Sequence, residues 1–375
     1  MSNQKIQSMI NSALELQINY LYLCNLKLTE IPESIQLLSG QLENLYLKNN
    51  YIQKLPEFLL RMHKLKILDL SNNQIKELPD LSCFKSLECL YISNNQLTNL
   101  PESIGNLVSL NKLIAHDNQI SHLYFSFSSL KNLITVNFAN NCLSSLPNDL
   151  ENLEKLLHIN LSNNYLSCLP DSFSYLKSLK RLYLSYNQME EFPNCITSCH
   201  SLDNLYINNN KLAWIPDSIS QLTNLECLNA SFNLLETLPD SFVKLTRLQE
   251  LYLNNNKFQE IPYSIKYLEK LQHLGLHHNN IQYLPNWNWN CYLKQLVKLD
   301  ISYNQIAQLP DKLFDNFINS KNFRVLDISN NNLIDLPNLD KFKYIRNKTF
   351  YLHNNLLQFN QPNQKKLNKF IITVQ

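Results

Sequence analysis

Tyrosine side chains recur at one regular spacing along this sequence, and the chemistry that they offer is recognition rather than catalysis. Seven of them share the same place in a repeating pattern: Tyr22, Tyr46, Tyr91, Tyr183, Tyr206, Tyr252 and Tyr351. Tyrosine supplies a large contact area with little side-chain entropy to lose, and it is enriched among the residues that dominate interface energetics. The stripe therefore predicts a surface that binds another protein.

The stretch from residue 181 to residue 252 carries the richest part of this predicted surface. Tyrosine also suits a half-exposed strand, and that alternative stays open for any single residue. Tyr186 and Phe232 are harder to explain in that way, because they stand three residues after the tyrosine position, where asparagine or another polar residue is usual. With an arginine nearby, they complete the predicted partner-binding set: Arg181, Tyr183, Tyr186, Tyr206, Phe232 and Tyr252.

Histidines gather near one part of the chain and raise the question of a metal site. His273, His277 and His278, with His353 further along, match no compact spacing of metal ligands. Each occupies an ordinary variable position of the pattern. We therefore expect surface histidines, with neither a metal nor another cofactor.

Two further pairs of residues could support catalysis. Cys89 and Cys227 fall on the same face as the tyrosines, but no arrangement of histidine and acid beside either thiol can be argued from the sequence. Asp300 and Asp327 hold the tyrosine position in consecutive repeats and could act as an acid–base pair. Because an open sheet implies no enclosed pocket, a solvated face or a patch that binds Lys or Arg is the preferred interpretation. No catalytic residue is predicted.

A unit with the pattern LxxLxLxxNxLxxLP positions these residues and recurs mostly every 23 residues. A clear copy runs from Leu65 to Pro79, and its first residue is numbered position 1. Positions 4 and 6 are expected to point inward from a short strand, and positions 3, 5 and 7 outward to a concave face. Repeats begin at Ile18, Leu42, Leu65, Leu87, Leu110, Leu133, Leu156, Leu179, Leu202, Leu225, Leu248, Leu271, Leu296 and Phe323, with a degraded fifteenth near Asn347.

Asparagine and proline mark where each predicted strand turns away. Position 9 is Asn in fourteen repeats, where its amide can both donate and accept hydrogen bonds to the backbone. Thirteen of the fourteen prolines follow position 14, and the segment after them is expected to form a short helical or 3₁₀ turn on the convex side. The fifth repeat has Tyr124 in the proline place, so its turn is expected to depart from the others.

The pattern resembles the leucine-rich-repeat family, in the 23-residue subtype of cytosolic Ras-scaffold proteins and of repeat-only translocated bacterial effectors. The resemblance covers nearly the whole chain. It implies an α/β leucine-rich-repeat solenoid, or horseshoe, with a parallel β-sheet on the concave face and short helical or 3₁₀ turns on the convex face. It also implies a scaffold whose partner is a small GTPase or a host signalling protein.

Three segments are expected along the chain: a capping helix at 1–17, a domain of about fifteen repeats at 18–360, and a C-terminal cap or tail at 361–375. A solenoid needs closed ends, and apolar residues at helical spacing, among them Ile6 and Ile10, suit the first of these caps. Two longer repeats carry extra residues near Trp287 and Phe314. Packing or a second binding surface could explain these convex bulges.

Composition excludes several classes of function. With 33 basic and 31 acidic residues, no overall charge favours nucleic acid or an anionic membrane. Three glycines cannot build a glycine-rich phosphate loop. Nine scattered cysteines, an odd number, fit a reducing compartment. We expect a monomer in the cytoplasm, or one secreted into a host cytosol.

The function favoured by these observations is a protein-interaction module or scaffold that uses its concave, tyrosine-rich face. The rival class is an enzyme such as a ubiquitin ligase, which would need a C-terminal helical domain with a nucleophilic cysteine. Residues 361–375 contain no Cys. The chain is therefore predicted not to be an enzyme.

Overall fold

One three-residue strand forms in each repeat of the computed structural model, which describes residues 3–337, 347–357 and 372–373. The chain divides into two compact units, an N-terminal unit, Met1–Gln188, and a C-terminal unit, Met189–Gln375. The strands of the N-terminal unit pair in parallel and in chain order: β1 (Tyr20–Tyr22), β2 (Asn44–Tyr46), β3 (Ile67–Asp69), β4 (Cys89–Tyr91), β5 (Lys112–Ile114), β6 (Thr135–Asn137), β7 (His158–Asn160) and β8 (Arg181–Tyr183).

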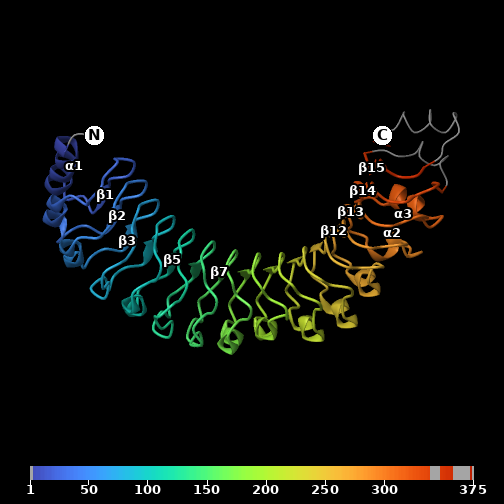
Figure 1. Cartoon of the computed structure of the whole chain (residues 1–375), viewed down its shortest axis with the longest axis horizontal. Coiled ribbons are helices and arrows are strands. Elements are labelled where there is room, and N and C mark those ends of the chain that lie inside the picture. The colour runs from blue at the N-terminus through green and yellow to red at the C-terminus, as the bar shows by residue number, and fades with distance from the viewer. Residues whose placement is uncertain (1–2, 338–346, 358–371, 374–375) are drawn as a thin grey trace. The chain divides into compact units, whose positions relative to one another are not determined.

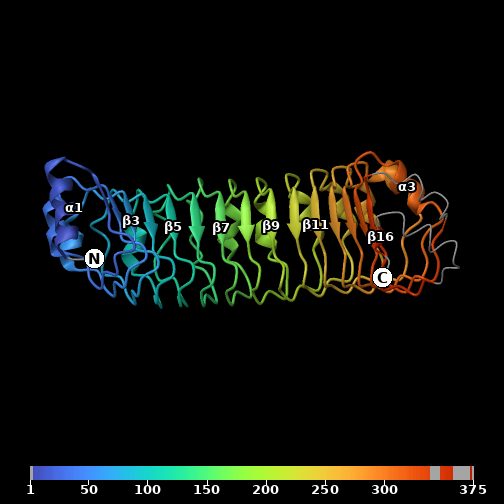
Figure 2. The same ribbon diagram turned by 90° about the horizontal axis from the view of Figure 1, so that it is seen from above.

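The C-terminal unit repeats the same parallel arrangement, and Figure 2 shows the strands of each unit side by side. Its strands are β9 (Asn204–Tyr206), β10 (Cys227–Asn229), β11 (Glu250–Tyr252), β12 (His273–Gly275), β13 (Lys298–Asp300), β14 (Val325–Asp327), β15 (Thr349–Tyr351) and β16 (Ile372–Thr373). Neighbouring strands pair equivalent positions, as Cys227 with Glu250 and Leu228 with Leu251. Equivalent side chains are therefore stacked along each sheet about 4.8 Å apart.

Alternation along each strand separates the core from the open face. Leu228 at position 4 and Leu251 one strand away are fully buried, whereas Asn229 and Tyr252 at position 5 stay partly exposed. Burial of a leucine side chain stabilises the fold by about 1.5–3 kcal/mol, and every repeat contributes several such residues. The core is consequently a continuous column of leucine and isoleucine behind the sheet of each unit.

The asparagine at position 9 links each repeat to its neighbour, as predicted. Asn164, for example, is 5% exposed. Its Oδ1 accepts a hydrogen bond from Leu143 N at 2.9 Å, and its Nδ2 donates to Phe138 O at 2.9 Å and Leu161 O at 3.0 Å. These bonds satisfy backbone groups where the chain leaves the strand, a place at which no sheet partner is available.

Short helices follow most of the prolines, on the side of each unit opposite its strands (Figure 1). They are the 3₁₀ helices η1 (Glu33–Leu38), η2 (Glu57–Arg61), η3 (Glu102–Asn106), η4 (Asp171–Tyr175), η5 (Asn194–Ser198), η6 (Asp217–Gln221), η7 (Asp240–Lys244) and η8 (Tyr263–Tyr267), and the α-helices α2 (Trp289–Tyr292) and α3 (Leu313–Asn319). The fifth repeat, which lacks the proline, has no helix in this segment, and neither do the third and sixth. In the third, Asp80 accepts a hydrogen bond from Ser82 N at 2.8 Å, a local turn that replaces the helix.

Packing accounts for most of the two predicted bulges. Trp289, Phe314 and Phe317 are at most 2% exposed. The ring of Phe317 stacks on Phe323 at a centroid distance of 4.0 Å and lies 5.6 Å from Trp289. The longer repeats thus form an aromatic core of their own beneath α2 and α3. Trp287, which belongs to the first predicted bulge, is partly exposed.

Helix α1 (Asn3–Glu15) stands at the start of the N-terminal unit and packs against β1 and η1. Ile6, Ile10 and Ala13, which fall on one side of this helix, are buried. The C-terminal cap residues 361–371 and 374–375 lie outside the described part of the chain. The fold class, an α/β leucine-rich-repeat solenoid with parallel strands on one face and short helices on the other, is confirmed.

Candidate protein-binding surface

Three of the predicted partner-binding residues, Tyr206, Phe232 and Tyr252, belong to neighbouring repeats of the C-terminal unit. Tyr206 and Tyr252 flank Asn229, because all three occupy position 5 of adjacent strands in register. Tyr252 Oη donates a hydrogen bond to Glu250 Oε2 at 3.2 Å, and Cys227 Sγ lies 3.8 Å from Tyr206 Oη. Burial and the neighbouring Glu250 carboxylate raise the pKa of Tyr252 to about 12, so its hydroxyl stays protonated as a donor.

The other three predicted residues lie together in the N-terminal unit. Arg181 and Tyr183 open and close β8, and Tyr186 follows three residues later. Arg181 and Tyr186 are exposed, and Tyr183 is partly exposed. The six residues therefore form two sets of three, one in each unit, and all six belong to the strand face or to its edge.

Position 8, where Tyr186 and Phe232 stand, has an unusual backbone. In all fifteen repeats its φ is positive, between 53° and 60°. Only glycine, asparagine and aspartate adopt this left-handed conformation readily, and it costs other residues on the order of 1 kcal/mol. Eleven repeats have Asn or Asp there.

Asparagine at position 8 also forms bonds that an aromatic residue cannot. Asn163 Nδ2 donates to Asn140 Oδ1 at 2.8 Å, and Asn140 Nδ2 donates to Asp117 Oδ1 at 2.8 Å. Tyr186 and Phe232 cannot form these side-chain hydrogen bonds, and their backbone is strained. Their side chains nevertheless remain 58% and 50% exposed. Local stability does not explain these two residues, and backbone strain of this kind is concentrated at functional sites.

Sequence reasoning missed two further residues that replace asparagine at position 8. His278 and Tyr303 also occupy position 8 with φ of 53°. Their rings stack at a centroid distance of 4.1 Å and an interplanar angle of 15°, and Tyr303 is 49% exposed. The signal was present in the repeat alignment, since both depart from Asn at position 8. His278 was expected to be a surface histidine at an ordinary variable position, and this interpretation obscured the signal.

The carboxylates of Asp300 and Asp327 each accept hydrogen bonds from the serine two residues later in the chain. Asp300 Oδ1 accepts hydrogen bonds from the hydroxyl of Ser302 at 2.8 Å and from its N–H at 3.3 Å. Asp327 binds Ser329 in the same way, at 2.6 and 3.0 Å. The serines at position 7 were expected to point outward, but Ser302 and Ser329 are buried, at 6% and 2% exposure. Both carboxylates thus stabilise strand ends.

The histidines do not converge either. His277 Nδ1 contacts His278 Nδ1 at 2.9 Å, while His273 Nδ1 lies 3.8 Å from Glu250 Oε1. Within the described residues, no group of three or more His, Cys, Asp or Glu side chains is placed to hold a metal ion. No helix among those residues has the length and apolar character to cross a bilayer.

The thiol of Cys227 is expected to react slowly. It is 4% exposed, and burial raises its pKa to about 11. At pH 8 about one thiol in a thousand would be ionised, and the thiolate is the reactive form. We expect iodoacetamide to modify the exposed Cys168 and Cys291 at least about tenfold faster than Cys227. Peptide mass spectrometry of a time course measures this, and early modification of Cys227 would contradict it.

Comparisons with known proteins agree with this geometry. The family model described as "Leucine rich repeat" matches residues 40–97, 150–189, 167–212, 200–258 and 224–281, together more than half of the chain. A leucine-rich-repeat protein of Leptospira interrogans has 28% identity and a TM-score of 0.85, with 96% of this chain and 97% of that chain covered. No curated protein matches in a sequence search.

Two further solved structures share the fold. The plant peptide hormone receptor RGFR1, solved in complex with RGF2, has 26% identity and a TM-score of 0.69, covering 90% of this chain and 67% of that chain. The functional domain of InlJ from Listeria monocytogenes, at 21% identity and a TM-score of 0.77 over 94% of this chain and 74% of that chain, shows the fold alone.

Leucine-rich-repeat proteins are typically protein-interaction modules rather than enzymes, and the fold of this chain supports such a module with a protein partner. The strand pattern, the asparagine at position 9, the match over more than half of the residues and the structural likeness all agree. This chain belongs to the leucine-rich-repeat family.

Proposed function

We propose that this chain binds a partner protein on the strand face of its repeats, with the aromatic side chains at positions 5 and 8 as anchors. The observation that carries the proposal is the set of exposed aromatic residues held at positive φ, where asparagine would be more stable. In the N-terminal unit the anchors are Tyr183 and Tyr186, beside Arg181. In the C-terminal unit they are Tyr206, Phe232, Tyr252, His278 and Tyr303.

Aromatic anchors of this type contribute large contact area in a single conformation. Tyr252 is already oriented by Glu250, and His278 and Tyr303 support one another by stacking. Preorganised side chains lose little entropy on binding, so more of the contact energy appears as affinity. The receptor RGFR1, similar in fold and solved with RGF2, supports recognition of a protein partner by repeats of this kind.

We also propose a small GTPase or a host signalling protein as the partner, and a monomer acting in the cytoplasm or in a host cytosol. Support for a reducing compartment comes from the nine cysteines, none of which forms a disulfide in the structure. The repeat spacing supports the 23-residue subtype, and the likeness to the Leptospira protein along 96% of this chain supports a bacterial source.

The decisive variant is Phe232→Asn. It places the residue that most repeats use at position 8, so the free energy of unfolding should rise by about 1 kcal/mol. If Phe232 is an anchor, affinity for the partner should fall by about 2 kcal/mol, or roughly thirtyfold. The partner is first captured from cytosolic lysate and identified by mass spectrometry, then its affinity for parent and variant is measured by calorimetry beside urea unfolding.

Tyr175→Ala is the matched control, because Tyr175 is an aromatic residue with 58% exposure in η4, on the helical side of its repeat. It should leave affinity unchanged. An equal affinity for parent and Phe232→Asn would remove the strand face as the binding surface. A loss of stability in Phe232→Asn would instead show that the side chain packs in a way that its exposure does not indicate.

A further inference from the structure

One strand of the C-terminal unit has no side chain at position 5. Gly275 holds this position in β12 and is the only glycine there among the fifteen repeats. It pairs in register with Tyr252 of β11 and Asp300 of β13, so it leaves a gap between their side chains on the strand face. The gap is a cavity of about 220 Å³, here named the Gly275 notch. Its lining is Tyr252, Asn254, His273, Leu274, Gly275, His277, Lys298 and Asp300.

The carboxamide of Asn254 satisfies the backbone of β12 in place of the missing side chain. In several other repeats an Asn or Asp at position 5 accepts a hydrogen bond from the N–H of position 7, as Asn229 does from Ser231 N at 3.1 Å. At Gly275 the acceptor comes from the preceding repeat, because Asn254 Oδ1 accepts from His277 N at 3.1 Å. A Cβ on Gly275 would lie 2.6 Å from this oxygen. Glycine inside a strand weakens it and often marks a place where a ligand approaches the backbone closely.

Ring stacking elsewhere in the chain shows what the notch lacks. Tyr22 and Tyr46 hold position 5 of adjacent strands, and their rings stack at a centroid distance of 4.5 Å and an interplanar angle of 13°. The spacing of paired strands, about 4.8 Å, thus matches the distance between stacked rings. Tyr252 has no such neighbour on its β12 side, since Gly275 carries no side chain. A ring placed in the notch would lie beside Tyr252 as Tyr46 lies beside Tyr22.

The charged groups around the notch are paired with one another. Lys298 Nζ lies 3.6 Å from Asp300 Oδ2, and His273 Nδ1 lies 3.8 Å from Glu250 Oε1. Burial lowers the pKa of His277, which keeps its ring neutral near pH 7. An ion that entered would lose hydration without meeting an unpaired counter-charge. The notch therefore favours an uncharged group.

We propose that the Gly275 notch receives an aromatic side chain of the partner protein, stacked on Tyr252 in the place that a position-5 side chain of β12 would fill. This inference rests on the proposed function and names the chemistry of the partner's anchor. The volume of about 220 Å³ suffices, because a cavity of about 150 Å³ holds benzene. The Tyr252 ring is already oriented by its hydrogen bond of 3.2 Å to Glu250. One wall of the notch is thus preformed, which lowers the entropic cost of binding.

Fluorine NMR of the whole chain tests the notch without the partner. The probe is the N-acetyl amide of para-fluorophenylalanine, whose resonance broadens on binding, and its Kd should be on the order of 1 mM for a ligand of this size. The N-acetyl amide of tryptophan should displace it at least about fivefold more effectively than the same derivative of leucine or of glutamate. Absence of binding, or equal displacement by the leucine or glutamate derivative, would overturn the proposal.

Two variants assign the probe to the notch. Gly275→Tyr puts a ring of the chain itself into the notch and should abolish probe binding. It also displaces the Asn254 carboxamide, so its circular dichroism spectrum is compared with that of the parent. Tyr252→Leu leaves Gly275 and Asn254 in place, removes the stacking wall and should weaken probe binding at least about threefold. An unchanged probe affinity in Tyr252→Leu contradicts the proposal whether or not Gly275→Tyr folds.

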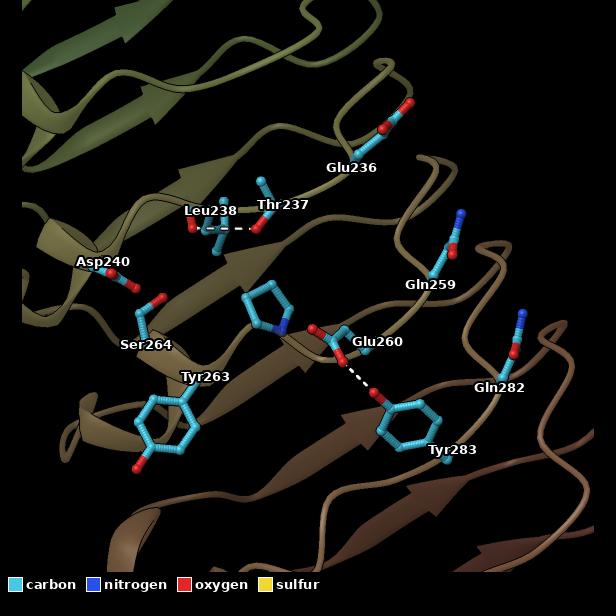
Figure 3. Close-up of a pocket in the computed structure, with 11 residues that line it drawn as sticks. Glu236, Thr237, Leu238, Asp240, Gln259, Glu260, Tyr263, Ser264, Gln282 and Tyr283 are labelled. Atoms are coloured by element: carbon cyan, nitrogen blue, oxygen red, sulfur yellow. Dashed lines mark hydrogen bonds between the residues drawn. The ribbon is translucent and has the colours of Figure 1, made fainter.

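Tyr283→Leu is the matched control. Tyr283 borders a larger hollow of the same unit, and its Oη donates a hydrogen bond to Glu260 Oε2 as Tyr252 Oη does to Glu250 (Figure 3). The same change at this exposed tyrosine should alter probe affinity by less than about twofold, because sites that share no contact act independently. Equal losses in Tyr283→Leu and Tyr252→Leu would show that the probe binds exposed tyrosines in general, which removes the notch as a site.

The identified partner separates this inference from the proposed function. Gly275→Tyr should weaken partner binding at least about tenfold, since it excludes an aromatic anchor. An unchanged affinity in Gly275→Tyr beside a weakened one in Phe232→Asn would overturn the notch alone. An unchanged affinity in both variants would remove the whole strand face as the binding surface.

Discussion

Replacing Asn164 with alanine is expected to destabilise the protein by about 3 kcal/mol or more. The variant leaves Leu143 N without its acceptor, next to a side chain that is 5% exposed. It also removes one of two donors from the carbonyls of Phe138 and Leu161, which keep hydrogen bonds of 3.0 Å from Asn141 and Asn187. Each buried polar group without a partner costs about 1–3 kcal/mol. Asn164→Asp keeps the shape and the acceptor but sets a carboxylate against carbonyl oxygens, so it should be at least as harmful.

Urea unfolding followed by circular dichroism measures this effect. Asn132→Ala is the control, because Asn132 is exposed and both bonds of its amide are at the surface: it donates to Val108 O at 3.1 Å and accepts from Lys155 Nζ at 2.8 Å. It should change the free energy of unfolding by no more than about 0.5 kcal/mol. If Asn164→Ala and Asn132→Ala lowered the free energy of unfolding equally little, the hydrogen bonds of the position-9 asparagines would not be what joins the repeats.

Phe317→Ala should lower the free energy of unfolding by about 3–5 kcal/mol. Phe317 is 2% exposed and stacks on Phe323 beneath α3, so the truncated side chain leaves a cavity between rings that cannot collapse onto it. Phe317→Leu retains part of the volume and should lose about 1.5 kcal/mol. The change in the urea midpoint across the three proteins reports the packing directly.

The surface control for this series is Tyr124→Ala, since Tyr124 is 62% exposed. Its stability should stay within about 0.5 kcal/mol of the parent. An unchanged stability in Phe317→Ala together with weaker partner binding would reverse the interpretation of the bulge, from a local core to a second binding surface.

Much of this fold could be predicted because a solenoid is built from contacts between neighbouring repeats. The leucines at positions 4 and 6, the asparagine at position 9 and the proline after position 14 each have a local physical role. The residues of one repeat, such as Leu65 to Pro79, therefore predict the local structure of most of the other repeats. The convex turn is less regular, because the fifth repeat, with Tyr124 in the proline place, lacks the helix, and so do the third and sixth repeats, which keep Pro79 and Pro147.

The candidate surface was predictable only in part. Tyr186 and Phe232 stood out by residue type, but composition does not reveal that position 8 has positive φ in every repeat. The positive φ shows that Tyr186 and Phe232 are strained as well as unusual in type. His278 and Tyr303 have the same strained backbone at position 8. Asp300 and Asp327 show the converse, because two acids that suggested an exposed pair are engaged with their own serines.

The sequence by itself determined which face of each repeat is apolar, where each strand ends and which side chains stand on the open face, since these depend on residue spacing within about 23 residues. Only the tertiary structure decided how side chains from different repeats combine. Tyr252, Gly275 and Asp300 belong to three repeats, and strand pairing alone places them around one notch. A repeat pattern specifies each residue's direction, whereas the shape and charge of a surface depend on the distances between repeats, which arise when the chain packs.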